Sequence, residues 1–88
     1  MAPGLILRMG MPEVLEYLRN GTNRTIEGIS ANTGIGADTV SAIIRDLEYH
    51  DFVTMEIHRG DSTVYGLTTD GLCLEHLITE IYSLGAEL

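Results

Sequence analysis

The sequence contains no lysine, and five arginines are its only residues that are always positively charged. Thirteen aspartates and glutamates oppose them, which gives a formal net charge of −8 at pH 7. The broad basic surface that binds nucleic acid non-specifically is therefore missing. The same balance fits two origins equally well: a protein kept soluble at very high salt, or a GC-rich genome.

The sequence has one cysteine, Cys73, so no disulfide can form within the chain. No apolar run approaches the roughly 18 residues of a membrane-spanning helix. The run "LIL" near the N-terminus is also too short for a signal peptide. We therefore expect a soluble, cytoplasmic protein. Its 88 residues have room for one small domain, residues 1–88.

Signatures of catalysis are missing as well. No glycine-rich phosphate loop follows a strand, and the sequence has no nucleophile elbow or recognisable pair of catalytic carboxylates. The stretch "TGIGAD" has two glycines, but it falls in a predicted turn between helices. We expect a protein that is not an enzyme and that uses no cofactor.

Three helices are predicted within residues 10–50. The first lies in "GMPEVLEYLRNG", where Gly21 is available for a left-handed cap. A short second helix in "TIEGISANTG" has Thr25 as a suitable N-cap, and a third runs from about Ala37 to Tyr49. The apolar stripe of the first helix is Met11, Val14, Leu15 and Leu18, and that of the third is Val40, Ile43, Ile44 and Leu47.

The hydrophobic period then changes from helical to alternating. Apolar and polar residues alternate from Val53 to His58 and again from Thr63 to Leu67, which predicts a β-hairpin over residues 52–67 with its tip at 59–62. A last helix is predicted over residues 70–85, and residues 1–9 form an N-terminal arm. The predicted apolar face of the last helix is Leu74, Leu77, Ile78 and Ile81.

The stretch from "EVLEYLRNGTNRTIEGISANTGIGADTVSAIIRDLEYHDFV" through "VYGLTTDG" resembles the winged helix-turn-helix domains of MarR-, ArsR- and TrmB-like prokaryotic regulators. The resemblance covers roughly residues 10 to 85. Its most specific parts are "TGIGADTVSAIIRDLE" and the "YGLTTDG" that leaves the hairpin. It implies an α+β fold with a three-helix core, a β-hairpin wing and a C-terminal helix.

The resemblance also implies sequence-specific binding of double-stranded DNA by a transcriptional regulator. The third helix would enter the major groove, and the hairpin tip would reach the backbone or the minor groove. Hydroxyl groups can contact phosphates or base edges, and an arginine can bond a guanine through two hydrogen bonds. The predicted DNA-binding residues are Thr39, Ser41, Arg45, Arg59, Arg24 and Tyr49.

Departures from the family pattern lie in the third helix. Relatives commonly have a serine at the position of Gly36, a basic residue or proline at Ala37, and a cation at Ala42. Asp38 would also face phosphates. A second interpretation therefore stays open, in which the domain is a protein-interaction module that binds a basic partner through its acidic outer face.

A homodimer is expected, because the last helix has more apolar residues than one stripe needs and a small domain gains by burying them. The predicted interface residues are Leu5, Leu7, Leu74, Ile78, Ile81 and Tyr82. A dimer would offer about six arginines to DNA, at the low end of the ~6–10 phosphate contacts of specific binders. Cys73 and His76 are one helical turn apart, but a single cysteine does not make a metal site, so none is predicted. Any small-molecule effector stays unassigned.

Overall fold

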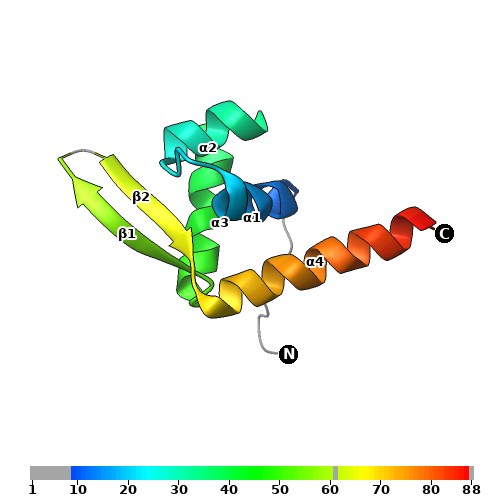
Figure 1. The fold of residues 1–88 in the computed structure, drawn as a ribbon. Coiled ribbons are helices and arrows are strands. Elements are labelled where there is room, and N and C mark those ends of the chain that lie inside the picture. Colours follow the sequence, from blue (N-terminus) through cyan, green and yellow to red (C-terminus); the bar gives the residue numbers. More distant parts are fainter. Residues whose placement is uncertain (1–8, 61, 88) are drawn as a thin grey trace.

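The computed structural model describes residues 9–60 and 62–87. Within them the elements follow the predicted order of three helices, a hairpin and a last helix (Figure 1). They are α1 (Met11–Asn20), α2 (Ile26–Thr33), α3 (Ala37–Tyr49), β1 (Val53–Arg59), β2 (Ser62–Leu67) and α4 (Thr69–Glu87). None of the described helices is long and apolar enough to cross a membrane.

The core lies between α1, α2 and α3, where the predicted apolar stripes of α1 and α3 meet. All four stripe residues of each of these helices are buried, and Ile29 of α2 is buried between them. Val53 of β1 and Ile78 of α4 complete the buried cluster. Full burial of each such side chain contributes about 1.5–3 kcal/mol, so this small set provides most of the drive to fold.

The ends of α2 show how local sequence sets a helix. The backbone N–H of Gly28 donates to Thr25 Oγ1 at 3.0 Å, which confirms the predicted N-cap. Gly34 ends the helix with φ +78°, a left-handed conformation that glycine adopts without a steric cost.

The prediction for Gly21 was wrong. It follows α1 in an extended conformation, with φ −79° and ψ 160°. Glycine is required at this position for a steric reason, because a Cβ there would overlap the ring of Tyr17. The Tyr17 hydroxyl donates to the carbonyl of Asn23 at 3.0 Å and accepts from Asn32 Nδ2 at 3.2 Å. Tyr17 therefore ties α1 to the following loop and to α2.

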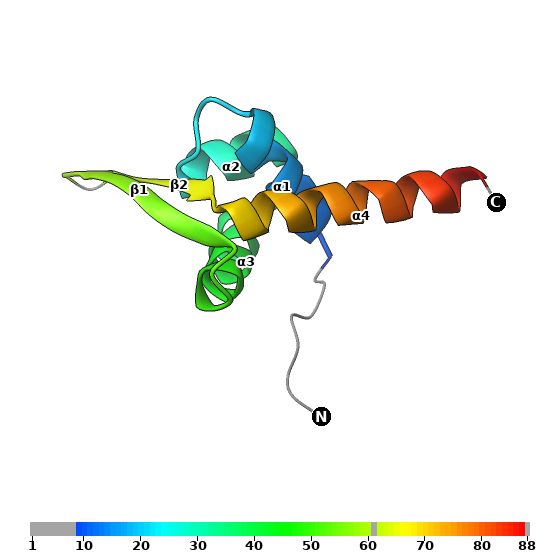
Figure 2. The same ribbon diagram turned by 60° about the horizontal axis from the view of Figure 1, so that its bottom comes forward.

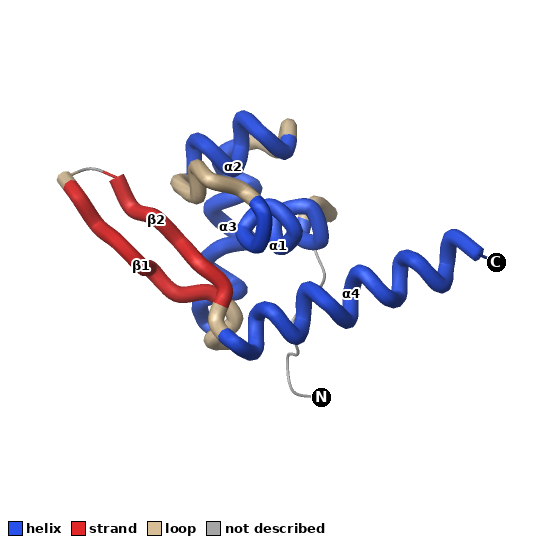
Figure 3. Tube along the Cα trace, viewed as in Figure 1, coloured by secondary structure: helices blue, strands red, loops and turns tan. Residues whose placement is uncertain are grey.

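The two strands form an antiparallel hairpin that extends from the helical body (Figure 3). Val53 pairs with Leu67 at the base, and Arg59 pairs with Ser62 at the tip. The register is irregular at Glu56, which has no partner in β2 because Met55 pairs with Tyr65 and Ile57 pairs with Val64. A bulge of this kind increases the local twist of a strand. The alternation in the sequence did not reveal it.

The last helix begins directly beneath the hairpin. Thr68 Oγ1 donates to the carbonyl of Asp51 at 2.7 Å and accepts from the N–H of Gly71 at 3.0 Å. A Cβ at Gly71 would overlap the carbonyl oxygen of Phe52, so the start of α4 lies close to the backbone of the residue that precedes β1. From there α4 runs past α1, and its C-terminal half extends beyond the body (Figure 2).

The single apolar face predicted for α4 is divided in the structure. Ile78 is buried in the core and Leu74 is partly buried against it. Leu77 and Ile81 point away, with 56% and 63% of their surface exposed, and Leu72 is exposed as well. Since α1 covers only one side of α4, the helix uses part of its apolar surface inside the chain and leaves the rest free.

Candidate nucleic-acid interface

The outer face of α3 is opposite its buried stripe and is open to solvent. Asp38, Thr39, Arg45 and Tyr49 are exposed there, and Ser41 is partly exposed. Tyr49 has 84% of its surface exposed. Of the predicted residues of this helix, Ser41, Arg45 and Tyr49 therefore lie on the outer face, and Thr39 lies at its edge near the helix N-terminus.

The N-terminus of α3 is open. Gly36 caps the helix without a side-chain hydrogen bond, and a Cβ at Gly36 would meet nothing within 4 Å. The first N–H groups of a helix have no partner inside it, and together with the helix dipole they favour an anion. Asp38 in the first turn opposes that preference by its charge.

The described arginine side chains differ in their partners. Arg19 pairs with Glu75, and Arg24 pairs with Glu56. Arg45 is exposed and takes part in no ion pair or side-chain hydrogen bond within residues 9–60 and 62–87. Its guanidinium, in the middle of the outer face of α3, therefore has its donors available for a ligand.

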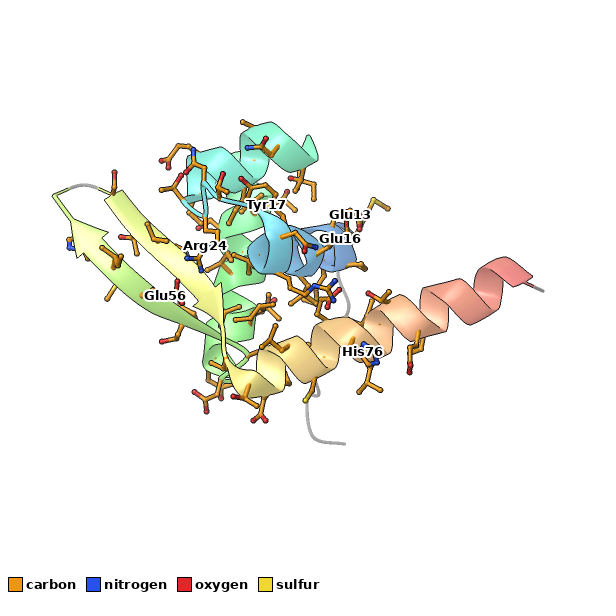
Figure 4. The ribbon with its side chains drawn as sticks, viewed as in Figure 1. Glu13, Glu16, Tyr17, Arg24, Glu56 and His76 are labelled. Atoms are coloured by element: carbon orange, nitrogen blue, oxygen red, sulfur yellow. The ribbon has the colours of Figure 1, made fainter. Side chains whose placement is uncertain are left out.

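Arg24 lies elsewhere than the outer face of α3. Its Nη1 donates to the carbonyl of Tyr65 at 2.9 Å and lies 2.5 Å from Glu56 Oε1. The side chain is 28% exposed, and its charge is largely balanced by Glu56 (Figure 4). In the structure Arg24 thus attaches the loop before α2 to the hairpin.

The hairpin tip has the backbone expected of a tight turn. Arg59 ends β1, and Gly60 follows with φ +56°, which favours glycine. The side chain of Arg59 lies outside the described part of the structure.

Halfway along the hairpin, burial raises the pKa of the Tyr65 hydroxyl, and the negative charges of Glu48 and Glu27 raise it further.

No protein-family model and no curated protein sequence matches this chain. Solved structures do match it. The fold of AF1382 from Archaeoglobus fulgidus superposes with a TM-score of 0.73 at 21% identity, over 91% of each chain. BpsR of Bordetella bronchiseptica, whose DNA binding is regulated by 6-hydroxynicotinic acid, gives a TM-score of 0.81 at 22% identity. A complex of Staphylococcus aureus MepR with DNA gives 0.78 at 23% identity.

The fold is a winged helix-turn-helix. The match covers 97% of this chain with BpsR and 92% with MepR, but only 62% and 61% of those two proteins. In this fold α2 and α3 form the helix-turn-helix, α3 is the recognition helix, and the β1–β2 hairpin is the wing. The fold predicted from the sequence is confirmed.

The predicted interface residues are dispersed in the winged domain. Leu5 and Leu7 lie outside the described residues, as does the side chain of Tyr82. Ile78 belongs to the core of the single chain, so it is unavailable to a second subunit, and Leu74 is partly covered. Ile81 is exposed, and so are Leu72 and Leu77 of the same helix, which are not among the predicted interface residues.

A groove of about 800 Å³ lies between α1, the end of α2 and α4. Leu15 and Ile78 supply apolar lining, while Glu13 and Glu16 lie at its α1 side (Figure 4). Glu75 is 3% exposed and is held there by Arg19. No local pattern predicts this groove, because its lining comes from three helices that meet only in the folded chain.

The cysteine and the histidine of α4 do not approach a third ligand in the described residues, where no three potential metal-binding side chains cluster. Cys73 is exposed, and His76 Nε2 lies 3.3 Å from Glu80 Oε1 one turn along the helix. His50 contacts aromatic rings instead, edge-on to Tyr49 and stacked on Phe52.

Proposed function

We propose that this protein binds double-stranded DNA as a homodimer and regulates transcription. The observation that carries the proposal is the exposed Arg45 in the middle of α3, which has no partner among the described residues. A free guanidinium at this position is suited to the O6 and N7 acceptors of guanine in the major groove. BpsR and MepR, which share the fold, are described with DNA binding and with bound DNA.

The proposed contact set combines hydroxyls with few cations. Thr39, Ser41 and Tyr49 supply polar groups on α3, Arg45 supplies the base contact, and Arg59 supplies the wing contact. With Arg24 balanced by Glu56, each chain offers two cations to DNA, so a dimer offers about four. The electrostatic part of the affinity is correspondingly small, and base recognition must account for more of it.

A second copy of the chain is the proposed partner of α4. Leu77 and Ile81 are exposed apolar side chains of α4, and the C-terminal half of this helix extends beyond the body (Figure 2). A helix that projects into water is only marginally stable by itself, so packing against a symmetry-related α4 would stabilise it. A two-fold dimer would also present two recognition helices to adjacent half-sites one helical turn apart.

The experiment is a titration of isotopically labelled protein with random and genomic duplexes across a wide salt range, followed by amide chemical shifts. Binding in the proposed mode moves amides of residues 37–45 and of the wing. The logarithm of the affinity should fall with the logarithm of salt with a slope no steeper than about −4, the value if all four arginines of the dimer neutralised a phosphate.

The absence of shifts at every salt concentration at which the protein is folded contradicts the proposal. A response to a basic polypeptide instead, with shifts over the acidic residues Asp38 and Glu48, supports the alternative of a protein-interaction module. The two outcomes fall on overlapping parts of α3 but differ in the ligand that causes them, so the same labelled sample separates them.

A further inference from the structure

Arg24 bonds to both strands of the wing from the loop that precedes α2. Its carbonyl accepts from the N–H of Tyr65 at 3.1 Å, and its Nη1 donates to the Tyr65 carbonyl at 2.9 Å. The same nitrogen pairs with Glu56 Oε1 of β1 at 2.5 Å. Arg24 therefore bonds to the backbone of β2 at Tyr65 and through its side chain to Glu56 of β1.

Two features of the wing place the Glu56 carboxylate beside Arg24. Glu56 is the bulged residue of β1, so it is released from the regular alternation of the strand. Across the hairpin, a Cβ at Gly66 would overlap the Glu56 carboxylate, and Gly66 is buried beneath it. The bulge and the missing side chain at Gly66 are separate features, and both place the carboxylate beside Arg24 (Figure 4).

The contact of Arg24 with Glu56 and Tyr65 lies between the base and the tip of the hairpin. At its base the wing is fixed by the buried Val53 and by the bond from Thr68 N–H to the Phe52 carbonyl, 3.0 Å long. Toward the tip, Met55 and Ile57 are about half exposed, so this part of the hairpin is less buried than its base. Arg24 is next to Thr25, the N-cap of α2, which packs on α3. The link therefore connects the middle of the wing to the helix-turn-helix.

We infer that Arg24 is a positioning residue, which fixes the wing relative to the recognition helix through Glu56 and Tyr65 and does not itself contact DNA. A phosphate contact made by Nη1 would have to break the pair with Glu56 and leave the Tyr65 carbonyl without its donor. The inference rests on the proposed DNA binding for its functional consequence. Its geometric part, the fixing of the wing, applies to the free protein.

The two roles for Arg24 predict opposite effects at Glu56. If Arg24 contacts phosphate, Glu56→Gln frees its charge and removes a repulsive carboxylate, so every duplex binds more tightly. If Arg24 positions the wing, Glu56→Gln loosens the hairpin and weakens binding, on the order of tenfold for a charged hydrogen bond of this partly exposed kind. Glu48→Gln is the matched control, because it removes one exposed carboxylate that pairs with neither Arg24 nor Glu56 in the described structure, and it should tighten binding slightly.

The experiment measures duplex affinity and amide hydrogen exchange for Glu56→Gln, Arg24→Gln and the exchanged pair Arg24→Glu with Glu56→Arg. We expect both single variants to bind more weakly and to exchange the Tyr65 amide faster in the free protein. The exchanged pair should recover much of the duplex affinity and of the Tyr65 amide protection, although it moves the cation from the loop before α2 to β1. Urea unfolding of each variant confirms that the comparison is between folded proteins.

Tighter binding of Glu56→Gln, matching Glu48→Gln, overturns the inference, as does unchanged protection of the Tyr65 amide in Arg24→Gln. If the unsubstituted protein binds no duplex, the proposed function fails and the DNA consequence of Arg24 fails with it. Amide exchange then still decides whether Arg24 fixes the wing, so the two failures are distinguishable.

Discussion

Arg19 on α1 and Glu75 on α4 form an ion pair in which Nη1 donates to Oε1 at 2.8 Å. The arginine is 46% exposed, whereas the glutamate is 3% exposed, and its second oxygen accepts from Thr79 Oγ1 at 2.9 Å. This pair ties the helix that projects furthest to the three-helix core, next to the buried Ile78. The pair thus adds a polar contact to the apolar packing that joins the proposed dimer helix to the core.

Replacing Arg19 with alanine should destabilise the fold by about 1.5–3 kcal/mol, because the buried Glu75 carboxylate keeps only Thr79 as a side-chain partner. Glu75→Gln should cost less, since it keeps a hydrogen-bond acceptor and removes the charge that needs compensation. Urea unfolding measures both. An Arg19→Ala protein within about 0.5 kcal/mol of the parent would mean that the pair contributes little.

Arg45→Ala should leave the stability within about 0.5 kcal/mol, because the side chain is exposed and has no partner in the described structure. On a preferred DNA site it should cost about 1–3 kcal/mol of binding free energy, with a much smaller loss on unrelated duplexes. Competition binding with matched and unmatched duplexes tests this. Asp38→Asn is the control and should tighten binding to all sequences; equal losses on every sequence for Arg45→Ala would exclude it as a base reader.

Leu77 and Ile78 are neighbours in α4 with opposite expected behaviour. Leu77→Ser should weaken self-association at least tenfold and change the stability of the monomer little, because the side chain is 56% exposed. Ile78→Ala should destabilise the monomer by about 2–5 kcal/mol through the cavity it leaves in the core. Sedimentation equilibrium combined with urea unfolding separates the two effects. A Leu77→Ser protein that associates like the parent would place the dimer surface elsewhere.

The Tyr65 hydroxyl gives the fold a dependence on alkaline pH. Burial first, then Glu48 and Glu27, raise its pKa, so the folded chain holds this proton more tightly than the unfolded chain. The stability from the neutral hydroxyl is complete below the unfolded pKa of about 10 and is lost as the pH rises through the folded pKa. Unfolding free energies at about pH 8 and about pH 11 should therefore differ less in Tyr65→Phe than in the parent. Identical differences in the two proteins would contradict the assignment.

The helices and their order were predictable because their signals are local. The stripe of α3 from Val40 to Leu47 defines a buried face by its spacing alone, and Thr25 caps α2 through a hydroxyl three residues from its donor. The outer face of α3 follows from the same periodicity, which is why Arg45 and Tyr49 were predicted to be accessible, and both are exposed.

The partners of charged side chains were not predictable in this way. Arg24 and Glu56 are 32 positions apart, and Arg19 and Glu75 are 56 apart, so no spacing rule connects them. Arg24 was predicted to contact DNA because its position in the chain does not reveal that Glu56 pairs with it in the folded protein. Likewise, Leu77 and Ile78 differ in exposure because α1 covers only one side of α4.

The sequence by itself determined the winged helix-turn-helix architecture, since hydrophobic periodicity and turn residues act over a few positions and select each element. Only the tertiary structure decided which of the described arginines is free. Packing brought Glu75 to Arg19 and Glu56 to Arg24, and it left Arg45 alone on the recognition helix. The physical reason is that each helix and strand is specified by residues close together in the sequence. The ion pairs join residues far apart in the sequence, which come together only when the elements pack.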